Sequence, residues 1–494
     1  MKMINTHATE KRQPVTMDNV LVAGWNKLRK HTSGESGAYK ITRSKRPMKL
    51  FSKQALAGAI ALALLGISGQ ASAIVNVQCP GDNNGDADWN DAGETQPANT
   101  KCMHLIAGDS YAKMSDGNPL YTFGFGDQTG TAPDQVIGEG ILSAEWPGPT
   151  IELDEGDHFF LNLTNVGTVV RPDLFDPHTV HFHGFPNASA AFDGVPEVSV
   201  SINMGSTLTY YYNIVEPGTY LYHCHVEATE HMEMGMLANL YVHPIQDELG
   251  CFDFGPDNAG TTEYDPERVP NGNCAAAVGD AGYVYNDGDG TTAFDVETAI
   301  QLSSFDQVFH DASLFVQPLP FALLEGNYPQ FNGRGYPDTV NPDPLPAPVD
   351  ATDPVADPAG LNGGKVTGTV GEPLTDGAIT QFLGSSIQLD RNTGEQRLLL
   401  RLSNVGLDRF WTITAMGLTM KVVGTGARHM RGIDGKNIYK EAASHNFGGG
   451  ETLDIIIDTT DVAPGTYFLH ATEVHQMSNA TQLDGGMITE IVIN

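Results

Sequence analysis

Short segments in which apolar and polar residues alternate recur along the chain from about residue 141 to its end. One of them, His158-Phe159-Phe160-Leu161-Asn162-Leu163, follows the turn residues Glu155-Gly156-Asp157. Alternation with a period of two predicts half-buried β-strands. The chain also contains 55 Gly and 29 Pro, and long amphipathic helical patterns are scarce. We therefore predict an all-β protein built of Greek-key β-sandwiches.

Two stretches of sequence occur twice, about 240 residues apart. Glu216-Pro217-Gly218-Thr219-Tyr220-Leu221-Tyr222-His223 is echoed by 463–470, and Leu163-Thr164-Asn165-Val166-Gly167 is echoed by 402–406. A repeat of this period indicates two copies of one domain. We expect these domains at 74–248 and 321–494, joined by an acidic, Gly-rich connecting segment at 249–320. The second domain also carries a Pro/Gly-rich insertion near 337–376.

The N-terminal part of the chain has the features of an export signal. Met48-Lys49-Leu50-Phe51 begins a short basic stretch, an apolar run follows, and Ala71-Ser72-Ala73 closes it. This order predicts a signal peptide at 48–73 with cleavage before Ile74, and hence a periplasmic or secreted protein with no membrane span after signal removal. Residues 1–47 place a long polar stretch ahead of the signal, so we expect them to be a non-native upstream extension and Met48 to be the true start.

Charge separates this leader from the rest of the chain. Residues 1–73 hold 12 of the 27 Lys and Arg but only 3 of the 60 Asp and Glu, which leaves 15 basic against 57 acidic residues beyond them. So acidic a body repels nucleic acid and anionic membranes and attracts cations or basic partners. Dense acidity can equally serve solubility alone. The acidic run Asp82-Asn83-Asn84-Gly85-Asp86-Ala87-Asp88 is open to both a calcium loop and an ordinary loop, because no bidentate Glu follows at the required place.

Five cysteines divide into two pairs and a remainder. We expect disulfides between Cys79 and Cys102 and between Cys251 and Cys274, in keeping with an oxidising compartment. The remaining thiol, Cys224, stands between two histidines. A metal would account for an unpaired thiol in an exported protein.

Six histidines and this one cysteine fall within residues 178–231. They form the segments His178-Thr179-Val180-His181-Phe182-His183 and His223-Cys224-His225, followed by His231 and Met236. In a strand, side chains two apart share a face, so a strand through 223–225 presents two imidazoles on one side and the thiolate on the other. Two imidazoles, a thiolate and a weak thioether suit type 1 (blue) copper. Zinc is the rival metal, and a lone Cys with a downstream Met fits copper better.

These segments resemble the ligand motifs of the multicopper oxidase family, within the cupredoxin superfamily. Trp146-Pro147-Gly148-Pro149, Asp193-Gly194-Val195-Pro196 and Asn332-Gly333-Arg334-Gly335 are similar to scaffold signatures of that family. The resemblance implies two cupredoxin-like domains. It also implies type 1 copper at His178, Cys224, His231 and Met236, type 2 copper at His181, and a type 3 pair at His183, His223 and His225. Cys224, with His223 and His225 beside it, would then carry electrons between the sites.

The sequence departs from the family in two places. His231 follows Cys224 by seven residues where the family usually has five. In the second domain, the positions matching the first motif are Trp411, Thr414 and Met416, and those matching His-Cys-His are His470, Ala471 and Thr472. A complete set of copper ligands is therefore expected only in the first domain, with His429, His445 and His475 left unassigned.

Three functions follow from these residues. The first is an oxidase that takes electrons from a small donor, phenolic or a metal ion, or from a redox partner, and reduces O2. Two-domain relatives are trimers with the cluster at the subunit interface, so the resemblance implies a homotrimer. The second is a two-site copper enzyme like nitrite reductase, although His181 occupies the position of the catalytic Asp in that group. The third is a single-copper electron carrier or copper-binding protein without catalysis.

Overall fold

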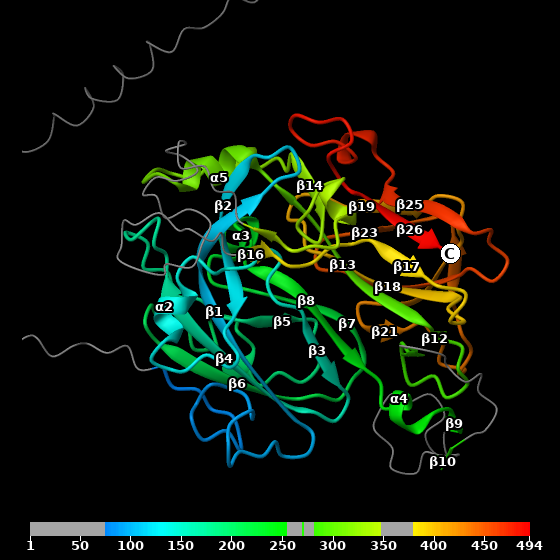
Figure 1. Cartoon of the computed structure of the whole chain (residues 1–494), viewed down its shortest axis with the longest axis horizontal. Helices are drawn as coiled ribbons and strands as arrows, with labels where there is room; N and C mark the ends of the chain where they lie inside the picture. Colours follow the sequence, from blue (N-terminus) through cyan, green and yellow to red (C-terminus); the bar gives the residue numbers. More distant parts are fainter. Residues whose placement is uncertain (1–74, 254–268, 271–280, 347–378) are drawn as a thin grey trace, which may run out of the picture. The chain divides into compact units, whose positions relative to one another are not determined.

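The computed structural model describes residues 75–253, 269–270, 281–346 and 379–494, all of which belong to one compact unit, Ser72–Asn494. The predicted signal peptide and upstream extension, Cys274 and most of the expected Pro/Gly-rich insertion lie outside the described residues. The described chain is mostly β-strand (Figure 1). No helix in the described ranges has the length and apolar character needed to cross a bilayer.

The first domain is a sandwich of two four-stranded sheets. One sheet has the order β2-β1-β4-β6 and the other the order β3-β8-β7-β5. Leu161 and Tyr210 of the first sheet and Phe182 and Leu240 of the second pack in one buried core between them. Its strands are β1 (Thr100–Lys113), β2 (Pro119–Asp127), β3 (Ile151–Asp154), β4 (His158–Gly167), β5 (His181–His183), β6 (Thr207–Asn213), β7 (Gly218–His223) and β8 (Leu237–His243).

The second domain repeats this arrangement. Its sheets contain the orders β14-β13-β18-β24 and β17-β26-β25-β19, which match the first domain strand for strand. Strands β20 and β21 extend the first of these sheets, β22 pairs with β20, and β23 extends the second sheet. The strands are β13 (Val296–Phe305), β14 (Tyr328–Phe331), β17 (Ile387–Leu389), β18 (Arg397–Asn404), β19 (Trp411–Ala415), β20 (Met420–Thr425), β21 (Arg428–His429), β22 (Lys440–Ala442), β23 (Ser444–Phe447), β24 (Thr452–Asp458), β25 (Gly465–Ala471) and β26 (Ile488–Ile493).

The remaining elements are short. Three two-stranded ribbons pair β9 with β10, β11 with β12 and β15 with β16. Their bounds are β9 (Phe252–Asp253), β10 (Val269–Pro270), β11 (Gly282–Tyr283), β12 (Ala293–Phe294), β15 (Leu345–Pro346) and β16 (Ile379–Gln381). The helices are α2 (Val136–Gly140), α3 (Ala228–Glu233), α4 (Gln246–Leu249) and α5 (Gln307–Ser313), with 3-10 turns η2 (Ala190–Phe192), η3 (Phe321–Leu323), η4 (Asp338–Val340) and η5 (Val474–Gln476).

The repeated sequence segments occupy equivalent turns in the two domains. The side chain of Asn165 accepts a hydrogen bond from the backbone N–H of Gly167 at 2.9 Å, and Asn404 accepts one from Gly406 at the same distance. At the other repeat, the Tyr220 hydroxyl donates to the Glu216 carbonyl oxygen, as the Tyr467 hydroxyl does to that of residue 463. The internal repeat is thus confirmed as two copies of one fold.

Strand β13 lies inside the stretch 249–320 that we expected only to connect the domains. It pairs in parallel with β18 and antiparallel with β14, so this part of the stretch belongs to the second sandwich. Three polar residues of this strand, Gln301, Ser303 and Ser304, are buried, and they weaken the alternation by which the other strands were recognised.

Buried polar contacts join the two sandwiches. Asp454 of β24 is fully buried and accepts hydrogen bonds from the hydroxyls of Thr219, on β7, and Tyr285. The Thr452 hydroxyl donates to the Thr219 carbonyl oxygen at 2.7 Å. Strand β7, which leads directly into the Cys224 segment, is therefore held by the second domain as well as by its own sheet.

Two disulfide predictions have different outcomes. Cys79 and Cys102 form a disulfide, which confirms the first pair. Cys251 is also disulfide-bonded, but Cys274 lies outside the described residues, so that pairing stays a prediction. Cys224 is the free cysteine of the described residues, and it is buried.

Candidate metal centre

Two neighbouring strands bring the predicted ligand segments together. β5 and β7 pair antiparallel with His181 opposite His223. His178 precedes β5 in an isolated bridge with Ile202, and Cys224 follows β7 directly. Helix α3 then carries His231 back toward Cys224. The chain order predicted from the sequence thus becomes a compact group in space.

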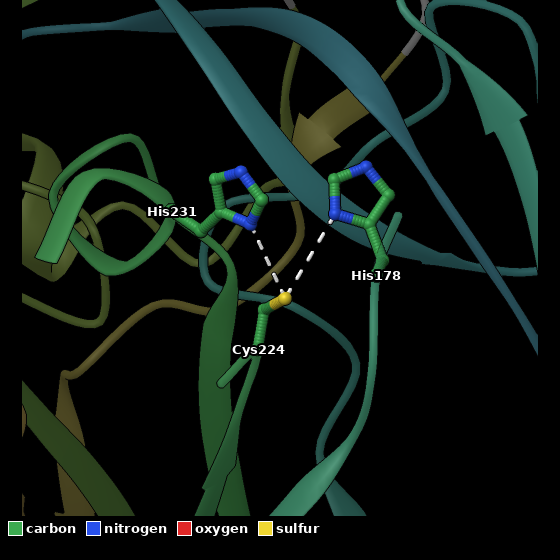
Figure 2. A group of neighbouring side chains, drawn as sticks. All are labelled: His178, Cys224 and His231. Atoms are coloured by element: carbon green, nitrogen blue, oxygen red, sulfur yellow. Dashed lines mark hydrogen bonds between the residues drawn. The ribbon is translucent and has the colours of Figure 1, made fainter. Parts of the chain in front are cut away.

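The Cys224 thiol lies between two imidazoles (Figure 2). Its Sγ is 3.3 Å from His231 Nδ1 and 3.8 Å from His178 Nδ1. Cys224 and His231 are 0% exposed and His178 is 2% exposed. The backbone N–H of Thr179 also points at the sulfur, 3.5 Å away. Two nitrogens and one sulfur therefore converge in a site closed to water.

The electrostatics of this group favour the thiolate. Burial by itself raises the pKa of Cys224, but the adjacent His231 and His178 hold that pKa well below its usual range. Burial likewise opposes the imidazolium of His231, yet Cys224 and the Asp176 carboxylate raise the pKa of His231 to about 10. The pair thus shares a proton that a bound metal cation would replace, as metal binding generally requires.

Met236 closes the same segment. Its backbone carbonyl accepts a hydrogen bond from Cys224 N–H at 3.0 Å, and its own N–H donates to the His231 carbonyl at 2.8 Å. Met236 is 0% exposed and belongs to the buried cluster that contains Cys224. The backbone therefore ties all three residues of this segment into one unit.

The two extra residues between Cys224 and His231 are accommodated by α3. The helix begins after Glu227, which adopts the left-handed backbone conformation with φ 44°. Non-glycine residues are uncommon there. This turn reverses the chain so that the single helical turn returns His231 to the thiol. The longer spacing thus leaves the ligand geometry intact.

A second group consists of His181, His183, His223 and His225. Ligand nitrogens of the first three lie within 4.8 Å of one another. His183 Nδ1 is 3.4 Å from His223 Nε2, and the His225 ring is centred 5.1 Å from that of His181. The structure therefore brings together all four histidines that the sequence assigned to a cluster.

Backbone carbonyls orient two of these rings. His181 Nδ1 lies 2.5 Å from the Asp193 carbonyl oxygen, and His223 Nδ1 lies 2.9 Å from that of Cys224. Such contacts fix the tautomer and leave the other ring nitrogen for a metal. Burial lowers the pKa of His223 to about 3, and burial together with the neighbouring imidazoles lowers that of His183. Both rings are thus held neutral, which is the form that binds metals.

The second domain presents different residues at the equivalent positions. Thr414 lies opposite His470 in the β19–β25 ladder, just as His181 lies opposite His223. Met416 is 60% exposed, and Trp411 is buried in the core of the sandwich. His470 repeats the contact of His223, with Nδ1 2.7 Å from the carbonyl oxygen of the next residue, and its Nε2 is buried without a hydrogen-bond partner.

The three histidines of the second domain that the sequence left unassigned contact other side chains or backbone groups, and none belongs to a group of potential metal ligands. His429 contacts the Tyr439 hydroxyl, His445 the Met420 carbonyl and His475 the Arg409 guanidinium. Over the described ranges, none of the three groups of potential ligands includes a residue of β19 or β25. Among the described residues, the Cys224 group and the histidine group therefore both belong to the first domain.

One residue of the second domain, Gly450, lies directly beside His183 of the histidine cluster. A Cβ placed on Gly450, whose φ is +82°, would lie 2.9 Å from His183 Nε2. Any side chain there would collide with the ring. The backbone of the second domain therefore forms one wall beside His183.

A third group of potential ligands, Glu152, His243 and Glu297, is an ion-pair network between the domains. His243 Nε2 is 2.8 Å from Glu297, which also pairs with the buried Arg401 at 2.7 Å. Despite the opposing effect of burial, Asp154 and Glu297 raise the pKa of His243 to about 9. The carboxylates there are neutralised by cationic side chains, so this group is explained without a metal.

The carboxylates of the acidic run at 82–88 accept hydrogen bonds from within their own loop. The Asp82 carboxylate accepts hydrogen bonds from the backbone N–H groups of Asn84, Gly85 and Ala87. Asp86 accepts from Asn84 and from the Asp88 backbone. These contacts are those of an ordinary Asx-rich loop.

Two residues near the Cys224 site were missed from the sequence. The Asp176 carboxylate lies 3.9 Å from His231 Nε2, which is buried and has no hydrogen-bond partner. The Thr179 hydroxyl accepts from the backbone N–H of His225 and so links the two ligand segments. The one feature of the sequence that could have indicated Asp176 is its position two residues before His178. Its proximity to His231 depends on a fold that brings the two loops together.

Comparison with known proteins gives a consistent picture. Family models described as multicopper oxidase match residues 131–247 and 353–492. An iron transport multicopper oxidase of Gibberella zeae is 40% identical over 96 residues, which are 19% of this chain and 14% of that protein. The L-ascorbate oxidase of Cucurbita pepo var. melopepo is 29% identical over 119 residues, 23% of this chain and 19% of that protein. The chain thus matches less than a quarter of the length of these curated relatives.

Among solved structures, the blue copper oxidase from Nitrosomonas europaea is similar with a TM-score of 0.50 and 18% sequence identity. The match covers 80% of this chain and 86% of that one. This likeness supports the two-sandwich fold described above.

Proposed function

Because the chain belongs to the multicopper oxidase family, a family of copper-binding proteins, we propose that it is a copper-dependent oxidoreductase that oxidises a small donor one electron at a time and reduces O2. One observation carries this proposal. The buried Cys224, flanked by His178 and His231, is bonded along the chain to His223 and His225, which belong to the four-histidine cluster. A single strand end thus serves two metal sites.

The donor atoms of the Cys224 site fit copper. A thiolate and two imidazole Nδ1 atoms, with the Met236 thioether in the same buried segment, are the soft ligands that copper favours. Copper held there would accept and release one electron at small reorganisation cost. The Nε2 of buried His231 faces the Asp176 carboxylate 3.9 Å away, which leaves Nδ1 for a metal.

The surrounding residues would keep these ligands in place. Thr179 donates its backbone N–H toward the sulfur, which stabilises the thiolate. The carbonyl of Asp193 orients His181, and that of Cys224 orients His223, so that the opposite nitrogens face the cluster. Burial on all sides excludes water from the thiol. The electron would leave the Cys224 site through its own backbone neighbours, His223 and His225.

We further propose that the donor is a phenolic compound or a metal ion, and that the active form is a homotrimer. The acidic body favours cationic donors. A second copy of the chain would have to supply whatever ligands complete the histidine cluster. Export to the periplasm or outside the cell is supported by the Cys79–Cys102 disulfide, since such bonds persist in oxidising compartments.

A two-site copper enzyme like nitrite reductase is the second candidate. The observation in its favour is that His183 Nδ1 lies 3.4 Å from His223 Nε2, so that a second-domain histidine of a neighbouring chain could complete a set of three. Three imidazoles can hold a single catalytic copper. A carrier with copper only at Cys224 is the third arrangement.

Copper per chain, measured on copper-loaded mature protein, distinguishes these functions. About four coppers support the oxidase, about two the reductase-like enzyme and about one the carrier. In parallel, Cys224→Ser should abolish visible absorption and donor-dependent O2 consumption, because an alcohol replaces the thiolate ligand. Blue colour that persists in this variant would contradict the site. Wild-type protein with about four coppers and no O2 consumption with any donor would contradict the oxidase.

A further inference from the structure

Helix α5 comes from the second domain but packs on the first. It connects β13 to β14, both of the second sandwich, and its residues contact β2 (Figure 1). It lies between the two matched ranges 131–247 and 353–492. Asp306 fixes its start, since its carboxylate accepts hydrogen bonds from the N–H groups of Val308 and Phe309. This side-chain cap stabilises the start of the helix.

The N-terminal half of α5 holds the loop between His231 and Met236. The Glu233 carboxylate, 4% exposed, accepts a hydrogen bond from Asp306 N–H at 2.7 Å. His310, 0% exposed, has Nε2 3.0 Å from the Glu233 carbonyl oxygen and Nδ1 2.6 Å from the Tyr121 carbonyl oxygen. The carboxylate of Glu233 is thus bonded to the residue that caps α5, and its carbonyl oxygen lies against the His310 ring.

The turn that follows Glu233 is wedged against the same part of the chain. A Cβ on Gly235, whose φ is +117°, would lie 2.7 Å from the Phe123 carbonyl oxygen and 3.6 Å from the ring of Phe305. Phe305, the last residue of β13, stacks on Trp146 at 4.2 Å and contacts His310 at 4.3 Å. Gly235 therefore packs closely against Phe123 and Trp146 of the first domain and against Phe305, which leads into α5.

The C-terminal end of α5 holds the other ligand loop. Arg171, which precedes His178 by seven residues, donates from Nη1 to the carbonyl oxygens of Ser313 and Phe315. Asp173 pairs with the same guanidinium at 2.7 Å and orients it. Arg171 is 8% exposed. One short helix therefore contacts both segments that carry ligands to the Cys224 site.

We propose that residues 306–315 act as a brace through which the second domain, lacking copper ligands of its own, holds the two ligand loops of the first domain in their metal-binding arrangement. His310 and Arg171 are positioning residues in this brace. The inference rests on the proposed copper site. Without the brace, the 231–236 loop separates from the His178 loop, and Cys224 becomes accessible while the rest of the sandwich stays folded.

Two variants of the full chain, His310→Gln and Arg171→Met, test this proposal, with His104→Gln as control. His104 is a buried first-domain histidine that contacts Thr164 and lies outside the brace. The first measurement is the rate at which Cys224 is alkylated in metal-free protein without denaturant. We expect both brace variants to react at least about 10-fold faster than wild type. Residues that hold metal ligands in place typically change metal affinity 10- to 100-fold when they are replaced. We therefore expect the copper affinity of both brace variants, measured by competition with a chelator, to fall about 10-fold or more. The control should match wild type in both.

Wild-type alkylation rates and copper affinity in both brace variants would overturn the proposal and leave α5 as packing alone. Equal acceleration in His104→Gln would also overturn it, because the effect would then report general destabilisation. If His310→Gln does not fold, Arg171→Lys takes its place, since it keeps the charge but removes the planar guanidinium that pairs with Asp173. The alkylation rates need no copper, so a wild-type protein that binds none would refute the proposed function while the brace is still tested.

Discussion

The two sandwiches share a strand order but differ in the side chains on one equivalent pair of strands, β5–β7 in the first domain and β19–β25 in the second. In the first domain, His181 faces His223 across β5 and β7, and Cys224 follows. In the second, Thr414 faces His470 across β19 and β25, and residue 471 is an alanine. Both ladders have the same pairing. The fold therefore tolerates ligands and non-ligands alike at these positions.

What the two domains do share is a set of turn contacts. Asn165 and Asn404 accept from the glycine two residues on, and Tyr220 and Tyr467 each donate to the carbonyl four residues earlier. These contacts close loops and satisfy backbone groups, which every copy of the fold requires. The comparison teaches that the scaffold and the metal chemistry are specified by separate residues, so one can be lost without the other.

The largest expected effect comes from paired substitutions at equivalent ladder positions. His223→Ala should lower donor-dependent O2 consumption about 100-fold or more, since even outer-sphere partners cost 10- to 100-fold. Its visible absorption should remain, because Cys224 is untouched. His470→Ala should leave both properties within about twofold of wild type if a second copy does not use this histidine.

Oxygen electrode and absorption measurements on the two variants decide the comparison. A loss of turnover in His470→Ala as large as in His223→Ala would show that the second domain still supplies a ligand. Unchanged turnover in His223→Ala would remove the histidine cluster from the reaction.

The second prediction concerns the junction between the domains, where the protonation of His243 should make the free energy of unfolding depend on pH. His243 of β8 has its pKa raised to about 9 by Asp154 and Glu297, and Glu152 lies near it as well. A histidine whose folded pKa lies above its unfolded value of about 6.5 stabilises the fold below pH 6.5, and this contribution is lost as pH rises through 9. We expect the free energy of unfolding to fall by about 2 kcal/mol from this group between pH 6.5 and 9.

Chemical denaturation of wild type and His243→Gln at pH 6 and pH 9 measures the effect. The difference between the two proteins isolates His243 from other groups that titrate in this range, such as Glu145, whose pKa burial raises to about 8. The difference should be largest at pH 6 and shrink by pH 9. A difference that does not change with pH would show that His243 is not protonated in the folded protein.

The smallest expected effect concerns the glycine wall beside His183. Gly450→Ala places a methyl group only 2.9 Å from His183 Nε2, closer than van der Waals contact allows. Gly435→Ala is a matched control, because its φ of +76° is similar and nothing lies within 4 Å. Both variants incur the strain of an alanine at positive φ, and overpacking adds about 1 kcal/mol in Gly450→Ala.

Thermal and denaturant unfolding of both variants, together with copper content, checks this prediction. Gly450→Ala should lose copper from the histidine cluster and keep the blue absorption. Equal stability and equal copper content in the two variants would mean that His183 can move aside without cost.

Much of this architecture could be predicted from the sequence, and the omissions have a physical cause. The repeat predicted two domains because each copy needs the same turns. The predicted cluster was recognisable because His181 and His183, and likewise His223 and His225, are two residues apart. The position of β13 could not be predicted, since its buried face is polar where it meets the first domain. Asp176, His310 and Gly450 were missed because each acts across contacts between residues distant along the chain.

The buried carboxylate of Asp454 has a consequence for how the molecule unfolds. It is 0% exposed, bonded to Thr219 and Tyr285, and lies 3.8 Å from the equally buried Arg401. Asp454 and Arg401 lie on adjacent strands of the second sandwich, and both contact the Thr219 hydroxyl of the first. Separating the two sandwiches would remove this shared partner, at a cost of about 1–3 kcal/mol. This contact couples the unfolding of one sandwich to that of the other, and we expect calorimetry to record a single cooperative transition for both.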